Sequence, residues 1–183
     1  MNLTIHTTST APAESKAMLE GIAEDLGFVP NLAASTATSP TLLAGFDGLR
    51  RAVAGGALDP VLRETAGLAV GVAVDNRYGV AFHSTVLAAL GASAEDLERM
   101  RAGDEPANVA AAAVYAFARE LVLTRGKVAE GTIRRTAEAG LSEADVLEVV
   151  AECTFAGLVG TLDNLAGRVE LDEPFRQATW SAP

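Results

Sequence analysis

The sequence predicts an all-α protein, a bundle of about eight helices built around a core helical hairpin. Three observations carry this prediction. Apolar residues recur at helical spacing along most of the 183 residues. No run alternates β-branched and polar residues between turns, as a strand would. Capping residues, prolines and glycines mark the helix boundaries.

Helix starts are the clearest local signals. Ser39-Pro40 and Asp59-Pro60 each place a capping side chain before a proline at the first helical position. Ser93 and Ser142 precede acidic first turns, which suit the positive end of the helix dipole. Glycines stand where several helices should end. We therefore expect helices over residues 14–26, 40–54, 60–75, 77–90, 94–102, 107–125, 130–139 and 143–169.

The composition restricts the partners and the compartment. Asp and Glu outnumber Lys and Arg by 24 to 14, a net charge of −10 that repels phosphate backbones and excludes nucleic acid. No apolar stretch approaches the roughly 20 residues of a membrane span, and the N-terminus has no signal-peptide pattern. We expect a cytoplasmic protein with no membrane partner. Residues 1–13 should form a flexible arm, and residues 14–183 a single domain with its core at 58–125.

The single cysteine, Cys153, excludes an intrachain disulfide, a C-x-x-C redox pair and a cysteine-rich zinc site. Its apolar neighbours predict an ordinary buried thiol. Near the C-terminus, Phe175 and Trp180 are aromatic side chains that we expect to dock on the body or on another subunit.

A candidate site centres on His83, in the middle of an expected helix. Asn76 and Gly79 lie on the same helix face, because spacings of three, four and seven residues align. Glu64 lies on the preceding helix, and a short joint folds the two helices together, so that Glu64 and His83 can meet. A carboxylate that holds one ring nitrogen leaves the other free for proton transfer. The alternative is a structural pair that only stabilises the hairpin.

The segment from Glu64 to Gly91 resembles the core of the alkylhydroperoxidase D-like (AhpD-like) proteins, a family that includes the carboxymuconolactone decarboxylases. The redox branch carries a Glu, a C-x-x-C beginning twelve positions later, and a His four positions past the second cysteine. Asn76 and Gly79 stand at the two cysteine positions, and Tyr78 at a tyrosine often found between them.

The elements at 27–31 and 39–43 resemble the N-terminal extension of longer, peroxidase-related members, and the resemblance covers residues 18–170. It implies an AhpD-like bundle, a small-molecule substrate, and homo-oligomers such as dimers, trimers or hexamers. Because neither Asn76 nor Gly79 can supply a thiolate, the thiol peroxidase activity of the redox branch should not carry over.

The favoured function is acid–base chemistry without metal or organic cofactor: decarboxylation, isomerisation or lactone chemistry on a small organic acid. In that hypothesis the catalytic residues are Glu64, His83 and Tyr78, and the substrate-binding residues are Asn76, Arg77 and Gly79.

Three alternatives stay open. The first is a non-catalytic oligomeric scaffold or ligand-binding protein. The second is a diverged alkylhydroperoxidase-type oxidoreductase that uses Cys153. The third is a metal site made of His83, Glu64 and Asp75, although their spacing matches no strong ligand motif.

Overall fold

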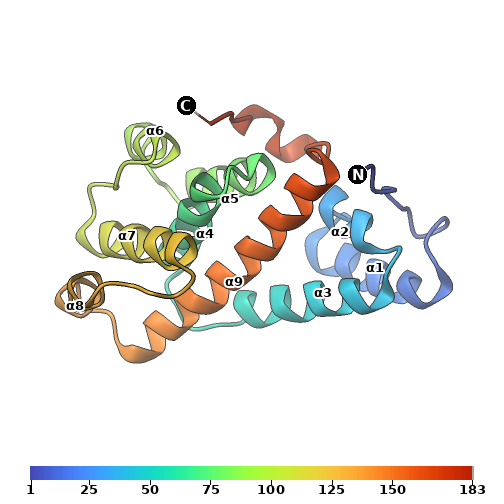
Figure 1. Cartoon of the computed structure of the whole chain (residues 1–183). Coiled ribbons are helices and arrows are strands. Elements are labelled where there is room, and N and C mark those ends of the chain that lie inside the picture. Colours follow the sequence, from blue (N-terminus) through green and yellow to red (C-terminus); the bar gives the residue numbers. More distant parts are fainter. Residues whose placement is uncertain (183) are drawn as a thin grey trace.

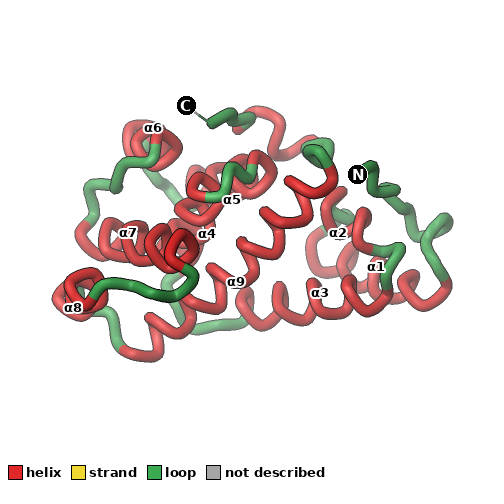
Figure 2. Tube along the Cα trace, viewed as in Figure 1, coloured by secondary structure: helices red, strands yellow, loops and turns green. Residues whose placement is uncertain are grey.

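The computed structural model describes residues 1–182 and contains only helices and loops in that range (Figure 2). The all-α prediction is confirmed. The elements are α1 (Ala13–Leu26), α2 (Asn31–Thr36), α3 (Pro40–Ala54), α4 (Pro60–Ala73), α5 (Arg77–Ala89), α6 (Ala94–Ala102), α7 (Val109–Thr124), α8 (Glu130–Glu138), α9 (Glu143–Ala166) and the C-terminal 3₁₀ helix η1 (Glu173–Ala178).

The long helix α9 runs diagonally through the middle of the molecule (Figure 1). Helices α4 to α8 lie on one side of it, and α1 to α3 lie on the other. The predicted hairpin is α4 and α5, and α4 also packs against α7 and α9. Two apolar cores result: one lies around α4 and α7, and the other joins α1–α3 to α5, the end of α9 and η1.

The capping residues act as the sequence predicts. The Asp59 side chain accepts hydrogen bonds from the first turn of α4, and Ser142 forms a reciprocal capping box with Asp145 at the start of α9. Helix α9 ends at Ala166, three residues before its predicted end. Gly167 takes a left-handed conformation with φ 74°, and this conformation ends the helix. The apolar Val169, which extended the predicted helix, therefore lies beyond its end.

Two elements were missed by the sequence patterns, because helices of six residues are too short to show periodicity. Helix α2 follows Pro30, and η1 lies in the tail. The tail docks on the body, as expected: Phe175 and Trp180 are both buried, and the indole Nε1 of Trp180 donates to the carbonyl of Arg101 at 2.9 Å.

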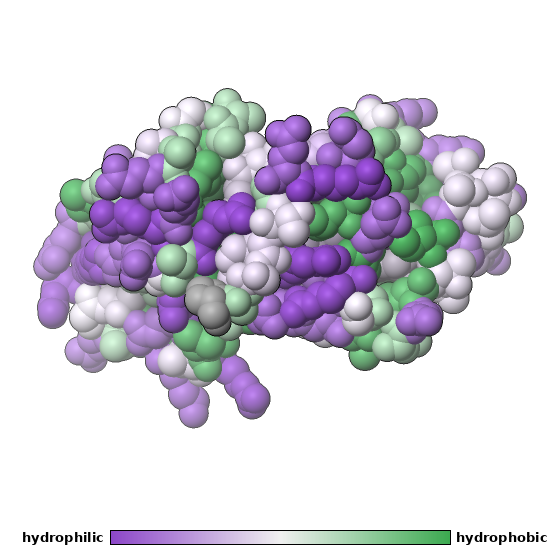
Figure 3. Space-filling model, turned by 90° about the horizontal axis from the view of Figure 1, so that it is seen from above, coloured by the Kyte–Doolittle hydropathy of each residue, from purple (hydrophilic) through white to green (hydrophobic). Residues whose placement is uncertain are grey.

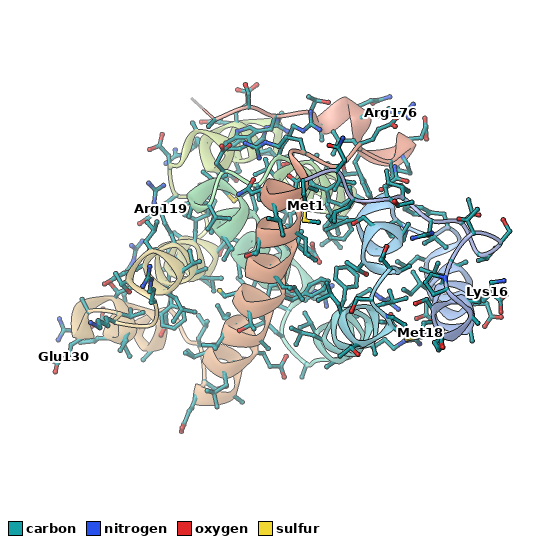
Figure 4. All side chains as sticks on the ribbon, turned by 45° about the vertical axis from the view of Figure 1, so that its right-hand side comes forward. Met1, Lys16, Met18, Arg119, Glu130 and Arg176 are labelled. Atoms are coloured by element: carbon teal, nitrogen blue, oxygen red, sulfur yellow. The ribbon has the colours of Figure 1, made fainter. Side chains whose placement is uncertain are left out.

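The N-terminal segment also contacts the body. The amino group of Met1 donates to the carbonyl of Leu165 at 2.6 Å, and Met1 lies beside α9 in Figure 4. His6 hydrogen-bonds through Nε2 to the hydroxyl of Thr38 at 3.0 Å. The flexibility of this arm stays a prediction.

Helices α4 and α5 approach each other closely at a glycine. A methyl group at Gly71 would lie 3.1 Å from Cγ2 and 3.2 Å from the backbone nitrogen of Val80. A small residue at this crossing therefore sets the short distance between the two helices that carry the candidate site.

Hydrophilic and hydrophobic side chains both occur on the surface. Seen from above, hydrophilic residues dominate one half of the molecule, and apolar residues gather more in the half that holds the N-terminal helices (Figure 3). Within residues 1–182, no helix is both long and apolar enough to cross a bilayer.

Candidate active site

The hairpin brings Glu64 and His83 together. Oε2 of Glu64 lies 2.8 Å from Nδ1 of His83, and both side chains are buried, with 5% of each residue exposed. Because a carboxylate only accepts, this hydrogen bond places a hydrogen on Nδ1. The ring lies directly against α4 at Gly67, where an added methyl group would come within 2.1 Å of Cε1 of His83. The imidazole is thus fixed on two sides.

A second carboxylate, Glu152 of α9, faces the other ring nitrogen. Its Oε1 lies 3.7 Å from Nε2 of His83, too far for a hydrogen bond, and it has no hydrogen-bond partner within residues 1–182. Only 3% of Glu152 is exposed. Sequence patterns did not single out this residue, although a lone carboxylate in the mainly apolar segment 149–155 of a helix is a usable signal.

Arg63 completes the charged group. Its Nε donates to Oε1 of Glu64 at 3.2 Å, and the Arg63 side chain is mostly buried. Its Nη atoms make no hydrogen bond to any residue in the described chain. Arg63 was not predicted from the sequence either, because an arginine on a helix usually marks a solvated face.

The surroundings shift the pKa values of all three acid–base groups. Burial alone would raise the pKa of Glu64, but the hydrogen bond and charge of His83, together with Arg63, lower it below its ordinary value. Burial alone would lower the pKa of His83, but Glu64 and Glu152 raise it above its ordinary value. Both shifts favour the ionised forms of Glu64 and His83 in the folded protein.

The pKa of Glu152 moves in the opposite direction to that of Glu64. Burial raises the pKa of Glu152 to about 7, the charge of His83 lowers it in part, and the charge of Glu64 raises it further. The site therefore contains a hydrogen-bonded Glu–His pair next to a carboxyl group whose pKa is about 7.

These groups form one wall of a cavity of about 280 Å³. The cavity lies between α4, α5 and α9 on one side and α1, α2, α3 and η1 on the other. Its polar lining consists of Arg50, Arg63, Glu64, His83 and Glu152. Most of the remaining lining is apolar, and five aromatic rings contribute: Phe46, Tyr78, Phe82, Phe155 and Phe175.

Of the other predicted site residues, Tyr78 and Gly79 line this cavity. The ring of Tyr78 is part of the wall, but its hydroxyl donates to the carboxylate of Asp172, in the tail before η1. The same carboxylate accepts from the backbone nitrogen of Asn31 at 3.1 Å. Tyr78 thus joins α5 to the tail and to α2, and its hydroxyl is already bonded.

Asn76 and Arg77 do not line the cavity. Asn76 caps α5, with its Oδ1 accepting from the backbone nitrogen of Gly79 at 3.0 Å, and Nη2 of Arg77 donates to the carbonyl of Val169 at 3.1 Å. This placement gives their predicted substrate contacts no support. Asp75 pairs with Arg168 at 2.6 Å, and residues 1–182 contain no group of three side chains spaced to hold a metal ion.

No thiolate is available at this site. Asn76 occupies the space beside Gly79, where an added methyl group would come within 2.3 Å of the amide nitrogen of Asn76. Cys153 is buried in the core around α4 and α7, as the sequence predicts. Burial, reinforced by the charge of Glu152, raises the pKa of the Cys153 thiol to about 12, so this thiol stays protonated at neutral pH.

The bond between Tyr78 and Asp172 gives a testable prediction. We expect Tyr78→Phe to lower the free energy of unfolding by about 1.5–3 kcal/mol, because a buried carboxylate loses a donor. The matched control is Tyr115→Phe, which removes a 2.7 Å bond to the neutral carbonyl of Met100 and should cost only about 1 kcal/mol. Urea denaturation of both variants measures the difference. An equal or larger loss at Tyr115 would contradict this role for Asp172.

The protein is thus an all-α bundle with a buried Glu–His pair at the centre of a helical hairpin. Residues 40–120 match the model of the carboxymuconolactone decarboxylase family. A comparison with curated protein sequences found no match.

Among solved structures, the fold is similar to an AhpD-core, peroxidase-related protein from Ralstonia eutropha JMP134, with TM-score 0.78 and 21% identity over 94% of this chain and 92% of that one. A peroxidase-related protein from Silicibacter sp. TM1040 has TM-score 0.77 and 15% identity over 96% and 92%. The debrominase Bmp8, as a cysteine-to-alanine variant in complex with 2,3,4-tribromopyrrole, has TM-score 0.77 and 18% identity over 97% and 95%. The chain has an AhpD-like fold, and its residues 40–120 match the carboxymuconolactone decarboxylase family.

Proposed function

We propose that this protein is an enzyme that carries out acid–base chemistry on a small organic acid, with His83 as the proton-transfer group. The observation that carries the proposal is the buried Glu64–His83 hydrogen bond of 2.8 Å on the wall of a cavity. Decarboxylation, isomerisation and lactone chemistry all need a proton to be moved at one position, and one oriented imidazole supplies that step.

Glu64 is the positioning residue in this mechanism. It holds Nδ1 of His83 and stabilises the imidazolium, so that Nε2 is the nitrogen directed at the cavity. In one half-step Nε2 gives its proton to a substrate carbon or oxygen, and in the reverse half-step the neutral ring takes a proton back. Gly67 keeps the ring plane in place throughout.

Arg63 is the group that we assign to the substrate carboxylate. Its Nε is held by Glu64, and its two Nη donors are free to bind a carboxylate at the cavity wall. Arg50, the other cation of the lining, is already paired with Asp25 and Asp47 at 2.7 Å. The aromatic rings would enclose the apolar body of the substrate. The small ring bound by the debrominase neighbour is a ligand of suitable size for such walls.

The decisive test is hydrogen exchange in D₂O, because it reports proton transfer even without net turnover. Wild-type protein is incubated with a panel of lactone carboxylates and enolisable keto acids, and ¹H NMR follows the loss of signal at the activated carbon. We expect His83→Gln to slow the catalysed exchange or decarboxylation by about 100- to 10,000-fold. Glu64→Gln should also slow it, since the ring loses its orienting carboxylate.

The matched control is His6→Gln, which removes the only other histidine and lies outside the cavity. An unchanged rate in His83→Gln would refute the proposal. If no panel member reacts, while His83→Gln and Glu64→Gln lower only the melting temperature, the structural role of the pair replaces the catalytic one.

A further inference from the structure

We propose that His83 and Glu152 together bind one hydroxyl group of the ligand, carried on an sp² carbon as in a phenol or an enol. The hydroxyl oxygen accepts from Nε2–H of His83, and the hydroxyl hydrogen is donated to Oε1 of Glu152. This inference rests on the proposed function, because it assigns the substrate class of the same cavity. It adds Glu152 to the functional residues proposed above, His83, Glu64 and Arg63.

The unpartnered oxygen of Glu152 is the main observation. Polar atoms that are buried in a protein nearly always have a hydrogen-bond partner, and an exception calls for an explanation. Oε1 of Glu152 has none in the described chain, although the residue is 3% exposed and lines the cavity. A ligand in the cavity that donates a hydrogen bond would satisfy it.

The distance between the His83 ring and the Glu152 carboxylate favours a hydroxyl group as the ligand atom between them. Nε2 of His83 and Oε1 of Glu152 are 3.7 Å apart, so they do not bond to each other. An oxygen placed about 2.8 Å from both atoms lies beside the line that joins them, on the cavity side. When Glu152 is ionised, that oxygen has to accept from His83 and donate to Glu152. A hydroxyl does both, whereas an ether or carbonyl oxygen only accepts.

The charged and aromatic side chains that line the cavity further restrict the class of ligand. A carboxylate at this point would face two acidic side chains, Glu64 and Glu152, so the acid group of a substrate belongs at Arg63 instead. The aromatic rings around the pair favour a flat, unsaturated body, because they offer ring faces and edges rather than hydrogen-bonding groups. A hydroxyl on an sp² carbon meets both conditions.

The test uses phenol and anisole as probes, since the two differ in that anisole has no hydroxyl hydrogen. Binding is measured at pH 8 by NMR titration of the full chain, where the Glu152 carboxyl is mainly ionised. We expect phenol to bind at least tenfold more tightly than anisole to the wild type. Glu152→Gln should reduce the affinity for phenol about tenfold or more and leave that for anisole nearly unchanged.

Glu143→Gln is the matched control, because Glu143 is exposed on the same helix and its replacement changes the net charge equally. Equal affinities for phenol and anisole, or phenol binding that is indifferent to Glu152→Gln, would overturn the inference. Failure of this inference can be distinguished from failure of the proposed function. Glu152-dependent phenol binding without any His83-dependent exchange refutes the catalytic proposal alone, and His83-dependent exchange without selectivity for the hydroxyl refutes only this inference.

Discussion

Replacing Gly67 with alanine should displace the His83 imidazole from its site. The added methyl group would lie 2.1 Å from Cε1, 2.3 Å from Nε2 and 2.6 Å from Nδ1 of the ring. The ring is rigid and sits between two helices, so it has to rotate away and abandon the carboxylate of Glu64. We expect a loss of about 2–5 kcal/mol in the free energy of unfolding, from overpacking and from a broken buried ion pair.

Chemical denaturation measures the loss, and the NMR signal of His83 reports the ring, because the chain has only one other histidine. Gly157→Ala in α9 is the matched control. A methyl group there meets nothing within 4 Å, and replacing a helix-interior glycine should stabilise the protein by about 0.5–1 kcal/mol. If Gly67→Ala were as stable as the control and kept the His83 signal unchanged, the close packing of ring and helix would be wrong.

The second large effect should come from Glu152 and should depend on pH. Burial raises the pKa of Glu152 to about 7 from an ordinary value near 4.5. Between these values the folded chain binds a proton that the unfolded chain has lost. The contribution of Glu152 to stability is therefore fully present below about pH 4.5 and is lost as the pH rises through 7. The difference corresponds to about 3 kcal/mol.

Glu152→Gln should remove this loss, because an amide stays neutral. We expect the stability of the variant, relative to wild type, to rise by about 2–3 kcal/mol between pH 5 and pH 8. The charged groups that act on Glu152 are Arg63 and Glu64 of α4 and His83 of α5. Arg50 of α3 also lines the cavity, and the substitution changes none of these residues.

Denaturation at a series of pH values measures the effect, and Glu143→Gln should leave the pH dependence of wild type unchanged. A difference between Glu152→Gln and wild type that stays constant from pH 5 to pH 8 would mean that Glu152 is ionised throughout that range. Its inferred part in binding a hydroxyl hydrogen would not be affected by that result, since the ionised form is the acceptor.

The sequence patterns predict most of the helices because caps and glycines act locally. Asp59 and Ser142 start α4 and α9 as predicted, whereas α2 and η1 depend on tertiary packing and leave no periodic signal. The meeting of Glu64 and His83 was also predictable, since both lie on one hairpin with a short joint.

Glu152 shows where sequence reasoning fails. It lies 69 positions after His83 along the chain, and only the packing of α9 against α4 and α5 places it at the ring. The placement of Tyr78 was equally hidden, because its partner Asp172 comes from the tail. A residue's spacing on its own helix does not say which distant element its side chain will meet.

The cavity is assembled from two kinds of segment, those inside and those outside the part of the chain that matches the family. Arg63, Glu64 and His83 lie inside the segment 40–120 that matches the family, but α1, α2, α9 and η1, which supply much of the wall, lie outside it. Leu26 and Phe175 both line the cavity, so substitutions there would change its shape without replacing Glu64 or His83. The shape of the cavity is therefore set largely by helices near the two ends of the chain, whereas Glu64 and His83 are placed by the central hairpin.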